Sequence, residues 1–210
     1  MRALLTALVA VALAMSPAAQ TPSAEQLARQ IQARYDQIKD FTADFTMTFQ
    51  GPLLRQKTSE RGTVKLKKPN RMWWKYTAPD KKEYVADGVR FYTYLAQDKI
   101  GMQTDLAKVS NSSTFLLFLA GKGDLTRDFT PALAPGQRED EWRLILTPKT
   151  KQEDYRTLTL TVDRRSLDLR GLHQQSDEGT HTFVFTGFRS NTGLKDSDFV
   201  FTFPKGTEIR

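Results

Sequence analysis

Residues 41–49 read FTADFTMTF, and every odd-numbered position in this stretch is apolar. The even-numbered positions carry threonine or aspartate. Successive side chains of a β-strand point to opposite faces, and threonine suits a solvated, pleated surface. The stretch therefore predicts a half-buried strand whose inward row contains Phe41, Phe45, Met47 and Phe49.

The same alternation recurs, less strictly, along most of the chain that follows. Its apolar positions are Val64/Leu66, Met72/Trp74/Tyr76, Leu144/Leu146, Leu158/Leu160/Val162, Leu167/Leu169, Phe183/Phe185 and Phe199/Phe201/Phe203. Turn-forming sequences such as Pro69-Asn70 and Asp87-Gly88 separate these runs. About ten strands joined by short turns indicate a mainly β (α+β) fold, an antiparallel meander that curls into a barrel or half-barrel.

Helical patterns occur in two places. Ser23 and Gln26 have the spacing of a capping box. The apolar residues that follow repeat on one helical face: Leu27, Ile31, Tyr35 and Ile38. This pattern predicts an amphipathic helix that ends near residues 39–40. In 111–121, hydroxyl side chains precede the apolar run FLLFLA and a glycine follows it, which favours a short helix, with a buried strand as the alternative.

The first residues have the pattern of an export signal. A basic start at Arg2 is followed by an apolar run over 3–15 and by the small-residue sequence Ser16-Pro17-Ala18. This pattern predicts a signal peptide over residues 1–18 that is cleaved near Ala18. The remaining residues, 19–210, are expected to form one exported domain. An uncleaved membrane anchor is the alternative, but the apolar run is short for a membrane span.

The composition argues against several classes of function. The 210 residues include no cysteine and two histidines, and the net charge is +7. Without cysteine there is no disulfide scaffold, thiolate metal site or thiol catalysis. His173 and His181 flank the turn at 177–179 and could face each other across a hairpin, but no third metal ligand is obvious nearby. Residues 139–141 read as a solvated acidic turn. We therefore expect no enzymatic activity, no cofactor and no bound metal.

Basic residues and tryptophans are interleaved over 65–75, as on some surfaces that bind nucleic acid. Strand alternation places Trp74 inside, however, and an export signal argues against a nucleic-acid partner. We expect these lysines to form a solvated strand face, with no nucleic acid bound. The faces around Lys65–Lys68 and Lys81-Lys82 are candidate docking surfaces for a protein.

Several short motifs occur in an order that resembles one family. They are Phe41–Met47 after the first helix, Gly62–Leu66, Lys68–Tyr76, Asp87-Gly88 with Tyr92 and Tyr94, Leu144–Lys149, Val162-Asp163 ahead of Leu167, and Phe199–Phe201 with Pro204–Gly206. Behind a signal peptide, this order and spacing resembles the periplasmic outer-membrane lipoprotein carrier (LolA) family. The resemblance implies an unclosed antiparallel β-barrel of about ten or eleven strands, with helices forming a lid over a hydrophobic cavity.

The resemblance also implies a function in the periplasm. A protein of this family binds the acyl chains of lipoproteins that an inner-membrane lipoprotein-releasing ABC transporter sets free. It then delivers these lipoproteins to an outer-membrane lipoprotein receptor. That receptor is itself lipid-anchored through a cysteine, so the absence of cysteine here favours the soluble carrier. A monomer is expected.

The candidate site combines inward strand positions with the apolar helices. The expected cavity residues are Phe41, Phe45, Met47, Phe49, Leu66, Met72, Trp74, Tyr76 and Leu144. The expected lid residues are Leu27, Ile31, Phe115, Leu116 and Leu119. The family commonly has an arginine directly before the Pro-Asn pair, where this chain has Lys68, the candidate latch between sheet and lid. Lysine offers a point charge where arginine offers a planar fork of donors, so the latch should differ in strength.

Other functions remain open at this point. A protein of the same fold can carry another lipid or a glycolipid, or can act as a sensor domain for mislocalised lipoproteins. A hydrolase remains possible only if His173 or His181 proves essential.

Overall fold

The computed structural model describes residues 21–52, 57–109 and 123–210. The predicted signal peptide and the apolar segment with Phe115, Leu116 and Leu119 lie outside the described residues. The helices within the described residues are α1 (Ala24–Asp36), α2 (Leu106–Val109), α4 (Leu125–Asp128) and the 3-10 helix η1 (Asp196–Phe199). Within these ranges, no helix combines the length and the apolar character needed to cross a membrane.

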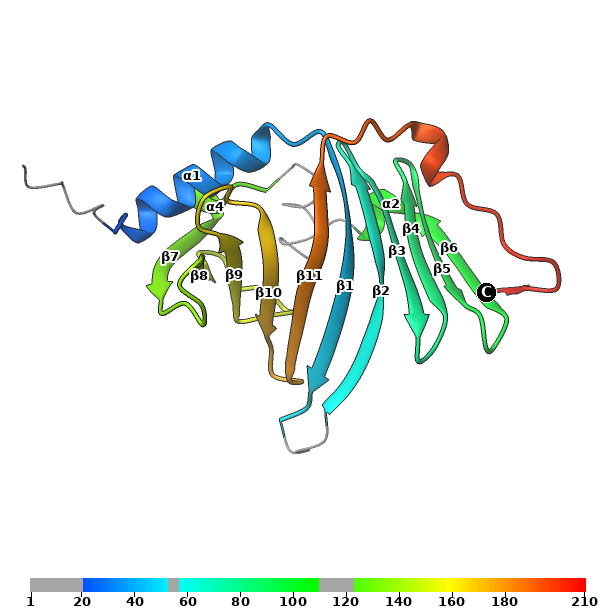
Figure 1. Cartoon of the computed structure of the whole chain (residues 1–210). Helices are drawn as coiled ribbons and strands as arrows, with labels where there is room; N and C mark the ends of the chain where they lie inside the picture. The colour runs from blue at the N-terminus through cyan, green and yellow to red at the C-terminus, as the bar shows by residue number, and fades with distance from the viewer. Residues whose placement is uncertain (1–20, 53–56, 110–122) are drawn as a thin grey trace, which may run out of the picture.

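The strands form one continuous sheet (Figure 1). Their bounds are β1 (Asp40–Gln50), β2 (Lys57–Lys67), β3 (Arg71–Ala78), β4 (Lys82–Asp87), β5 (Arg90–Leu95), β6 (Ile100–Asp105), β7 (Phe129–Ala134), β8 (Glu141–Pro148), β9 (Thr157–Asp163), β10 (Leu169–Gln175), β11 (Thr180–Ser190) and β12 (Glu208–Ile209). The order across the sheet is β12-β6-β5-β4-β3-β2-β1-β11-β10-β9-β8-β7.

The sheet is an unclosed barrel, as predicted. β7 and β12 lie at opposite edges of the 12-stranded sheet and do not pair with each other. All neighbouring strands run antiparallel except the two-residue β12, which pairs parallel to β6. The sequence predicted about ten or eleven strands, and this short edge strand has no sequence pattern of its own.

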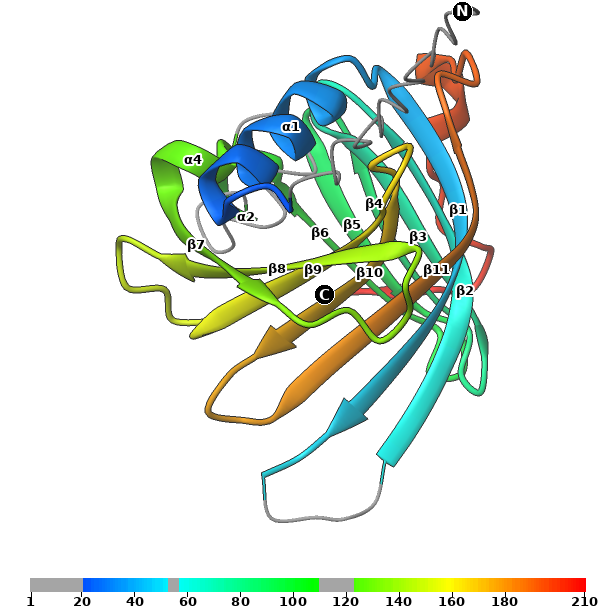
Figure 2. The ribbon, with the colours of Figure 1, turned by 60° about the vertical axis from the view of Figure 1, so that its left-hand side comes forward.

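The concave side of the curved sheet holds the main core (Figure 2). Along β1 the odd-numbered positions 41–47 are buried, whereas Asp44 and Thr46 are exposed. Phe45 pairs in register with Gly62 of β2 and with Phe185 of β11, so the buried row continues across the sheet. A Cβ on Gly62 would lie 2.1 Å from the backbone oxygen of Lys75 and 2.9 Å from Cζ of Phe45, so this position requires glycine.

Helix α1 begins as predicted and ends earlier. Oγ of Ser23 accepts the N–H of Gln26 at 3.2 Å, and Oε1 of Gln26 accepts the N–H of Ser23 at 2.8 Å, which confirms the capping box. The helix ends at Asp36, although Ile38 is still buried. The chain must leave the helix here because β1 starts at Asp40, whose carboxylate accepts the backbone N–H of Thr192 at 2.6 Å.

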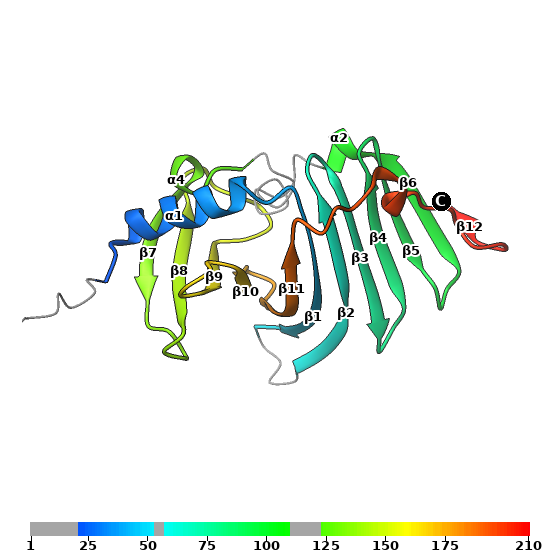
Figure 3. The same ribbon diagram turned by 45° about the horizontal axis from the view of Figure 1, so that its top comes forward.

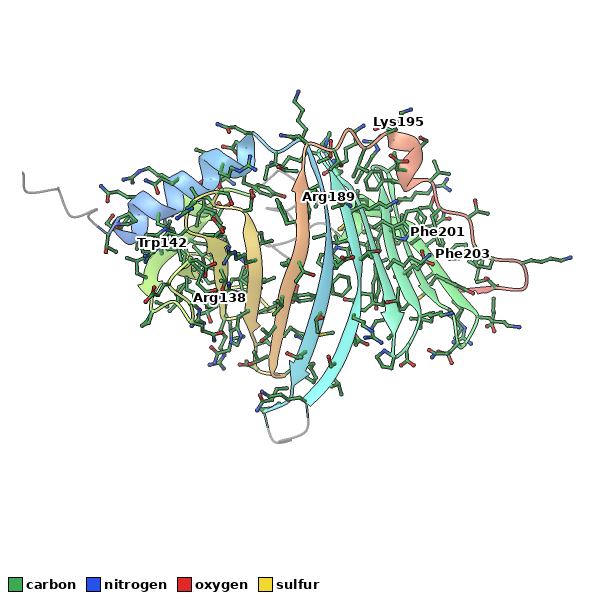
Figure 4. All side chains as sticks on the ribbon, in the orientation of Figure 1. Arg138, Trp142, Arg189, Lys195, Phe201 and Phe203 are labelled. Carbon is green, nitrogen blue, oxygen red and sulfur yellow. The ribbon has the colours of Figure 1, made fainter. Side chains whose placement is uncertain are left out.

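The strand predicted through Phe199, Phe201 and Phe203 is wrong. Phe199 ends η1, and the other two rings lie on an extended segment that pairs with no described strand (Figure 4). This segment covers the convex face of β3–β6, with Phe201 5.9 Å from Trp73 and Phe203 5.9 Å from Tyr92 between ring centroids. An extended segment that packs on the face of a sheet also buries every second side chain. Its sequence therefore alternates like that of a strand, although the segment is not paired with one.

The strand predicted to include Leu167 and Leu169 begins only at the second of these residues. Leu167 has a positive φ of 58° and follows the turn after β9. The carboxylate of Asp163 accepts the backbone N–H groups of Arg165 and Ser166 at 2.8 Å each, which stabilises this turn.

Candidate functional site

The predicted cavity residues all lie on the concave face of the sheet. Phe49 is half-buried and the others are buried: Phe41, Phe45, Met47, Leu66, Met72, Trp74, Tyr76 and Leu144. They come from β1, β2, β3 and β8, so the sheet curvature brings together residues from distant parts of the sequence. Their role in binding a ligand stays a prediction.

Five aromatic side chains meet at the middle of this face, and we term them the central aromatic cluster: Phe45, Trp74, Tyr76, Phe183 and Phe185. The ring centroid of Phe45 lies 5.1 Å from that of Trp74 and 4.9 Å from that of Tyr76, both in edge-to-face geometry. Phe183 lies 5.6 Å from Trp74. Such offset contacts are the preferred geometry of aromatic rings.

An aliphatic region continues the concave face toward β7. Its buried members are Leu144, Leu146, Leu158, Leu160, Val162 and Leu172, from β8, β9 and β10. The candidate site derived from sequence contained only Leu144 from this region and missed Phe183 and Phe185. The strand that carries Phe183 and Phe185 was predicted. The pairing of β11 with β1, which sets Phe185 opposite Phe45 and Phe183 opposite Met47, is the signal that could have identified these two residues.

Helix α1 packs against the β7 and β8 side of the sheet (Figure 3). Leu27 and Ile31, two of the predicted lid residues, are buried on its inner face. Oε1 of Gln32 accepts the backbone N–H of Leu125 at 2.9 Å, which ties α1 to α4. These helices therefore cover one side of the concave face, whereas α2 contacts β5 and β6 in the other half of the sheet (Figure 3).

Three different parts of the sheet hold the last turn of α1. From the β2–β3 turn, Nζ of Lys68 donates to the backbone oxygen of Tyr35 at 2.5 Å and lies 3.7 Å from the centroid of the Tyr35 ring. From the β9–β10 turn, Asp168 pairs with Arg34 at 2.8 Å. At the end of β11, Oγ of Ser190 accepts from Arg34 at 3.0 Å. Lys68 therefore connects sheet and helix, and its role as a latch stays a prediction.

Burial shapes the electrostatics of this contact. It lowers the pKa of Lys68, an effect that the nearby carboxylate of Asp36 partly opposes. Burial also raises the pKa of the Tyr35 phenol well above its usual value. The Tyr35 phenol is therefore neutral at neutral pH.

Comparison with known proteins fits this geometry. The sequence profile of the family described as "Outer membrane lipoprotein carrier protein LolA" matches residues 36–202. The chain belongs to the LolA family. This membership confirms the resemblance, and because the family consists of carrier proteins, it also confirms the prediction that the chain is not an enzyme.

The relatives of this LolA-family chain are distant in sequence and similar in length. The outer-membrane lipoprotein carrier protein of Cupriavidus taiwanensis is 28% identical over 197 residues, which cover 91% of each chain. That of Chromohalobacter salexigens is 27% identical over 202 residues, which cover 95% of this chain and 91% of the relative. An uncharacterized conserved protein from Thermus thermophilus superposes with a TM-score of 0.57 at 10% identity, covering 88% of this chain and 99% of that one. This last likeness shows the fold alone.

The basic positions of the LolA-family sheet divide between its two faces. Lys65 is exposed on the convex face, and Arg71 pairs there with Asp196 of η1 at 3.0 Å. Lys82 is partly buried on the concave side, where its Nζ lies 2.7 Å from Oε1 of Glu60. Register places this lysine opposite the inward Tyr76, and a docking surface around Lys81-Lys82 stays a prediction.

The two histidines lie on opposite faces of the sheet. His173 pairs in register with Thr182, and its Nδ1 lies 2.9 Å from Oγ1 of that residue on the convex side. His181 lies on the concave side, with its ring centroid 4.6 Å from that of Phe49. The possibility that they face each other across the hairpin is therefore wrong. Burial lowers the pKa of both imidazoles.

The acidic turn is only partly solvated. Asp140 is exposed, but Glu141 is buried as the first residue of β8, and its Oε1 accepts the backbone N–H of Gln137 at 2.6 Å. The expectation of a solvated turn is therefore wrong for Glu141, which stabilises the turn before its strand. Within the described ranges, no group of three or more His, Asp or Glu is placed to hold a metal ion.

Proposed function

We propose that this chain is a periplasmic carrier that binds the acyl chains of lipoproteins on the concave face of its sheet. One observation carries the proposal: a continuous cluster of buried apolar side chains, aromatic around Phe45 and aliphatic around Leu144, lines the concave face across strands from both halves of the sequence. Aromatic and thioether side chains such as Met47 and Met72 adapt readily to flexible alkyl chains. The names of the relatives and of the family support the same function.

The energetics of the cargo require such a surface. Each buried methylene contributes about 0.8 kcal/mol, so one palmitoyl chain carries about 12 kcal/mol of transfer free energy. A protein with two or three such chains cannot cross water unless a carrier covers them. Binding to the concave face replaces most of the water contacts of the chains, and no covalent step is needed.

We infer that the carrier works between two membrane partners. An inner-membrane lipoprotein-releasing ABC transporter supplies the cargo, and an outer-membrane lipoprotein receptor accepts it. Transfer to the receptor needs no energy source if the receptor binds the cargo more tightly than the carrier does. A monomer with helices that can move away from the concave face meets this requirement.

Native mass spectrometry tests the proposal directly. The chain from Ala19 onward is incubated with a purified triacylated lipoprotein in detergent, and in parallel with its unacylated form. A 1:1 complex with the acylated form alone is the expected result. Equal binding to both forms would contradict acyl-chain recognition, and binding of free lipid alone would indicate a carrier of another lipid or glycolipid.

Phe45→Arg provides a binding-deficient comparison, because it places a charge in the middle of the central aromatic cluster. Thr46→Arg is the matched control, since Thr46 is exposed on the opposite face of the same strand. The control should bind the acylated lipoprotein like the unchanged chain. Circular dichroism of each variant establishes that it is folded before binding is compared.

A further inference from the structure

Two adjacent tryptophans of β3 differ in how their indole N–H groups are paired. Nε1 of Trp73, on the convex face, donates to Oε2 of Glu83 at 2.7 Å. Trp74 faces the concave side and is 8% exposed, and its Nε1 has no acceptor within the described part of the chain. Buried polar groups are nearly always paired, because an unpaired one costs free energy. The indole N–H of Trp74 is therefore a buried donor without a partner among the described residues.

A second unpaired atom lies further down the same face. Glu60 pairs in register with Met47, which places its side chain on the concave side. Its Oε1 accepts from Nζ of Lys82, whereas its Oε2 is buried and has no donor among the residues that the structure describes. Nζ of Lys82 also lies 4.5 Å from the centroid of the Tyr76 ring. The ion pair therefore leaves one carboxylate oxygen as a free acceptor.

These atoms belong to one group of contacts. Trp74 and Tyr76 are alternate residues of β3, about 7 Å apart along the strand, and the ring of Phe45 contacts both. Tyr76 in turn contacts Lys82, which holds Glu60. We term Glu60, Trp74, Tyr76 and Lys82 the polar cluster. Glu60, opposite Met47, lies toward the strand ends that carry Gln50 and Lys57, the lower ends in Figure 1, whereas Trp74, opposite Val64, lies nearer the other ends.

We propose that the polar cluster binds the polar linkage of an acylated ligand. The N–H of Trp74 donates to the carbonyl oxygen of an ester or amide, and Oε2 of Glu60 accepts from an amide N–H. The acyl chains then extend over Phe45 toward Phe41 and Leu66. Lys82 balances the charge of the carboxylate, so the apolar chains pass a neutral pair. This inference rests on the proposed function and adds where the polar linkage of the ligand binds.

The donor role of Trp74 is tested with Trp74→Phe, which keeps an aromatic ring and removes the N–H. The unchanged chain and the variant are titrated with a synthetic lipopeptide carrying two ester-linked palmitoyl chains, and with its ether-linked analogue, which lacks those carbonyl oxygens. We expect the affinity for the ester-linked ligand to fall about three- to tenfold, the value of one hydrogen bond, and that for the ether-linked ligand to stay constant. An equal loss for both ligands would overturn the assignment.

The role of the ion pair is tested with the double variant Glu60→Met/Lys82→Met. Replacing both charges by apolar side chains of similar volume leaves no unpaired buried charge. We expect weaker binding of a lipopeptide whose N-terminal amine is acylated, because its amide N–H would lose the acceptor on Glu60. The apolar fluorescent probe 1-N-phenylnaphthylamine should bind as before or more tightly. If both ligands weaken together, the pair is only structural and the proposal fails.

The matched control removes a pair on the other face of the same sheet. Lys75 and Glu83 lie on β3 and β4 at 3.7 Å, and Lys75→Met/Glu83→Met should change the affinity for neither ligand. The design also separates two failures. If the unchanged chain binds neither the lipopeptide nor its ether analogue, the proposed function is wrong. If it binds both equally and no variant discriminates between ligands, the proposed function stands and the polar cluster is not a ligand site.

Discussion

Removing the ammonium group of Lys68 should loosen the last turn of α1 and leave the sheet intact. The group makes a hydrogen bond to the Tyr35 carbonyl and a cation–π contact with the same residue. A charged hydrogen bond contributes about 1.5–3 kcal/mol and a cation–π contact about 0.5–2 kcal/mol. Burial of the ammonium, which lowers its pKa, offsets part of this gain. We therefore expect a net loss of about 1–3 kcal/mol, a shift of about five- to 150-fold toward the undocked helix.

Lys68→Met keeps the aliphatic stem, so the comparison isolates the charge. Hydrogen exchange of the amides in residues 27–36 measures opening of α1, and these amides should exchange faster by the stated factor. The amides of β9 should exchange as before, because they are paired with β8 and β10 and not with the helix. Lys65→Met is the control, since this lysine is exposed on the convex face of β2.

Lys68→Arg extends the test to a side chain that keeps the positive charge in a different shape. Arginine keeps the charge and offers five donors in a planar fork, so α1 should exchange no faster than in the unchanged chain. Unchanged exchange of α1 in Lys68→Met would refute the reasoning. Equal acceleration throughout the sheet would refute it as well, because Lys68 would then stabilise the whole fold and not the attachment of the helix.

Phe45→Ala should lower the free energy of unfolding by about 3–5 kcal/mol in urea titrations, because its buried ring contacts three other aromatic rings. Phe203→Ala should cost about 1–2 kcal/mol and increase the fluorescence of an apolar dye, since it uncovers Tyr92. The lowered pKa values of His173 and His181 mean that the unfolded chain binds protons more readily. Stability should therefore be constant above about pH 7 and fall as pH drops below about 6.5; His173→Gln/His181→Gln should flatten this fall in thermal melts.

Local patterns explain the parts of the fold that the sequence predicts well. The alternation in residues 41–49 depends on one pleated strand with one solvent-exposed face, and the Ser23–Gln26 capping box depends on four consecutive residues. The inward position of Trp74 follows from the same period of two. Each of these features is decided by neighbours in the chain, so no knowledge of the partner strands is needed.

The remaining errors arise where the decision depends on distant residues. Phe201 and Phe203 show the alternation of a strand because their segment packs on the face of the sheet. Only the tertiary structure shows that this segment has no hydrogen-bonded partner strand among the described residues. Lys82 stands in a basic run, and only its register against Tyr76 turns it toward Glu60. The inward apolar strand positions and the contact of Lys68 with α1 were therefore predictable, whereas the ion pair of Lys82 with Glu60 was not.

The pairing of β1 with β11 has a consequence for the order of folding. Gln50 pairs with Thr180 and Phe41 with Ser190, so the paired residues are 130 and 149 positions apart in the chain. A chain that emerges from its N-terminus can form the hairpins of β1–β6 early, but the edge of β1 then stays unpaired until β11 arrives. Such long-range pairing slows folding, and an exposed edge invites contacts with other chains. The seam in the middle of the sheet, and not the helices at its side, is therefore the place where a folding chain is most exposed to aggregation.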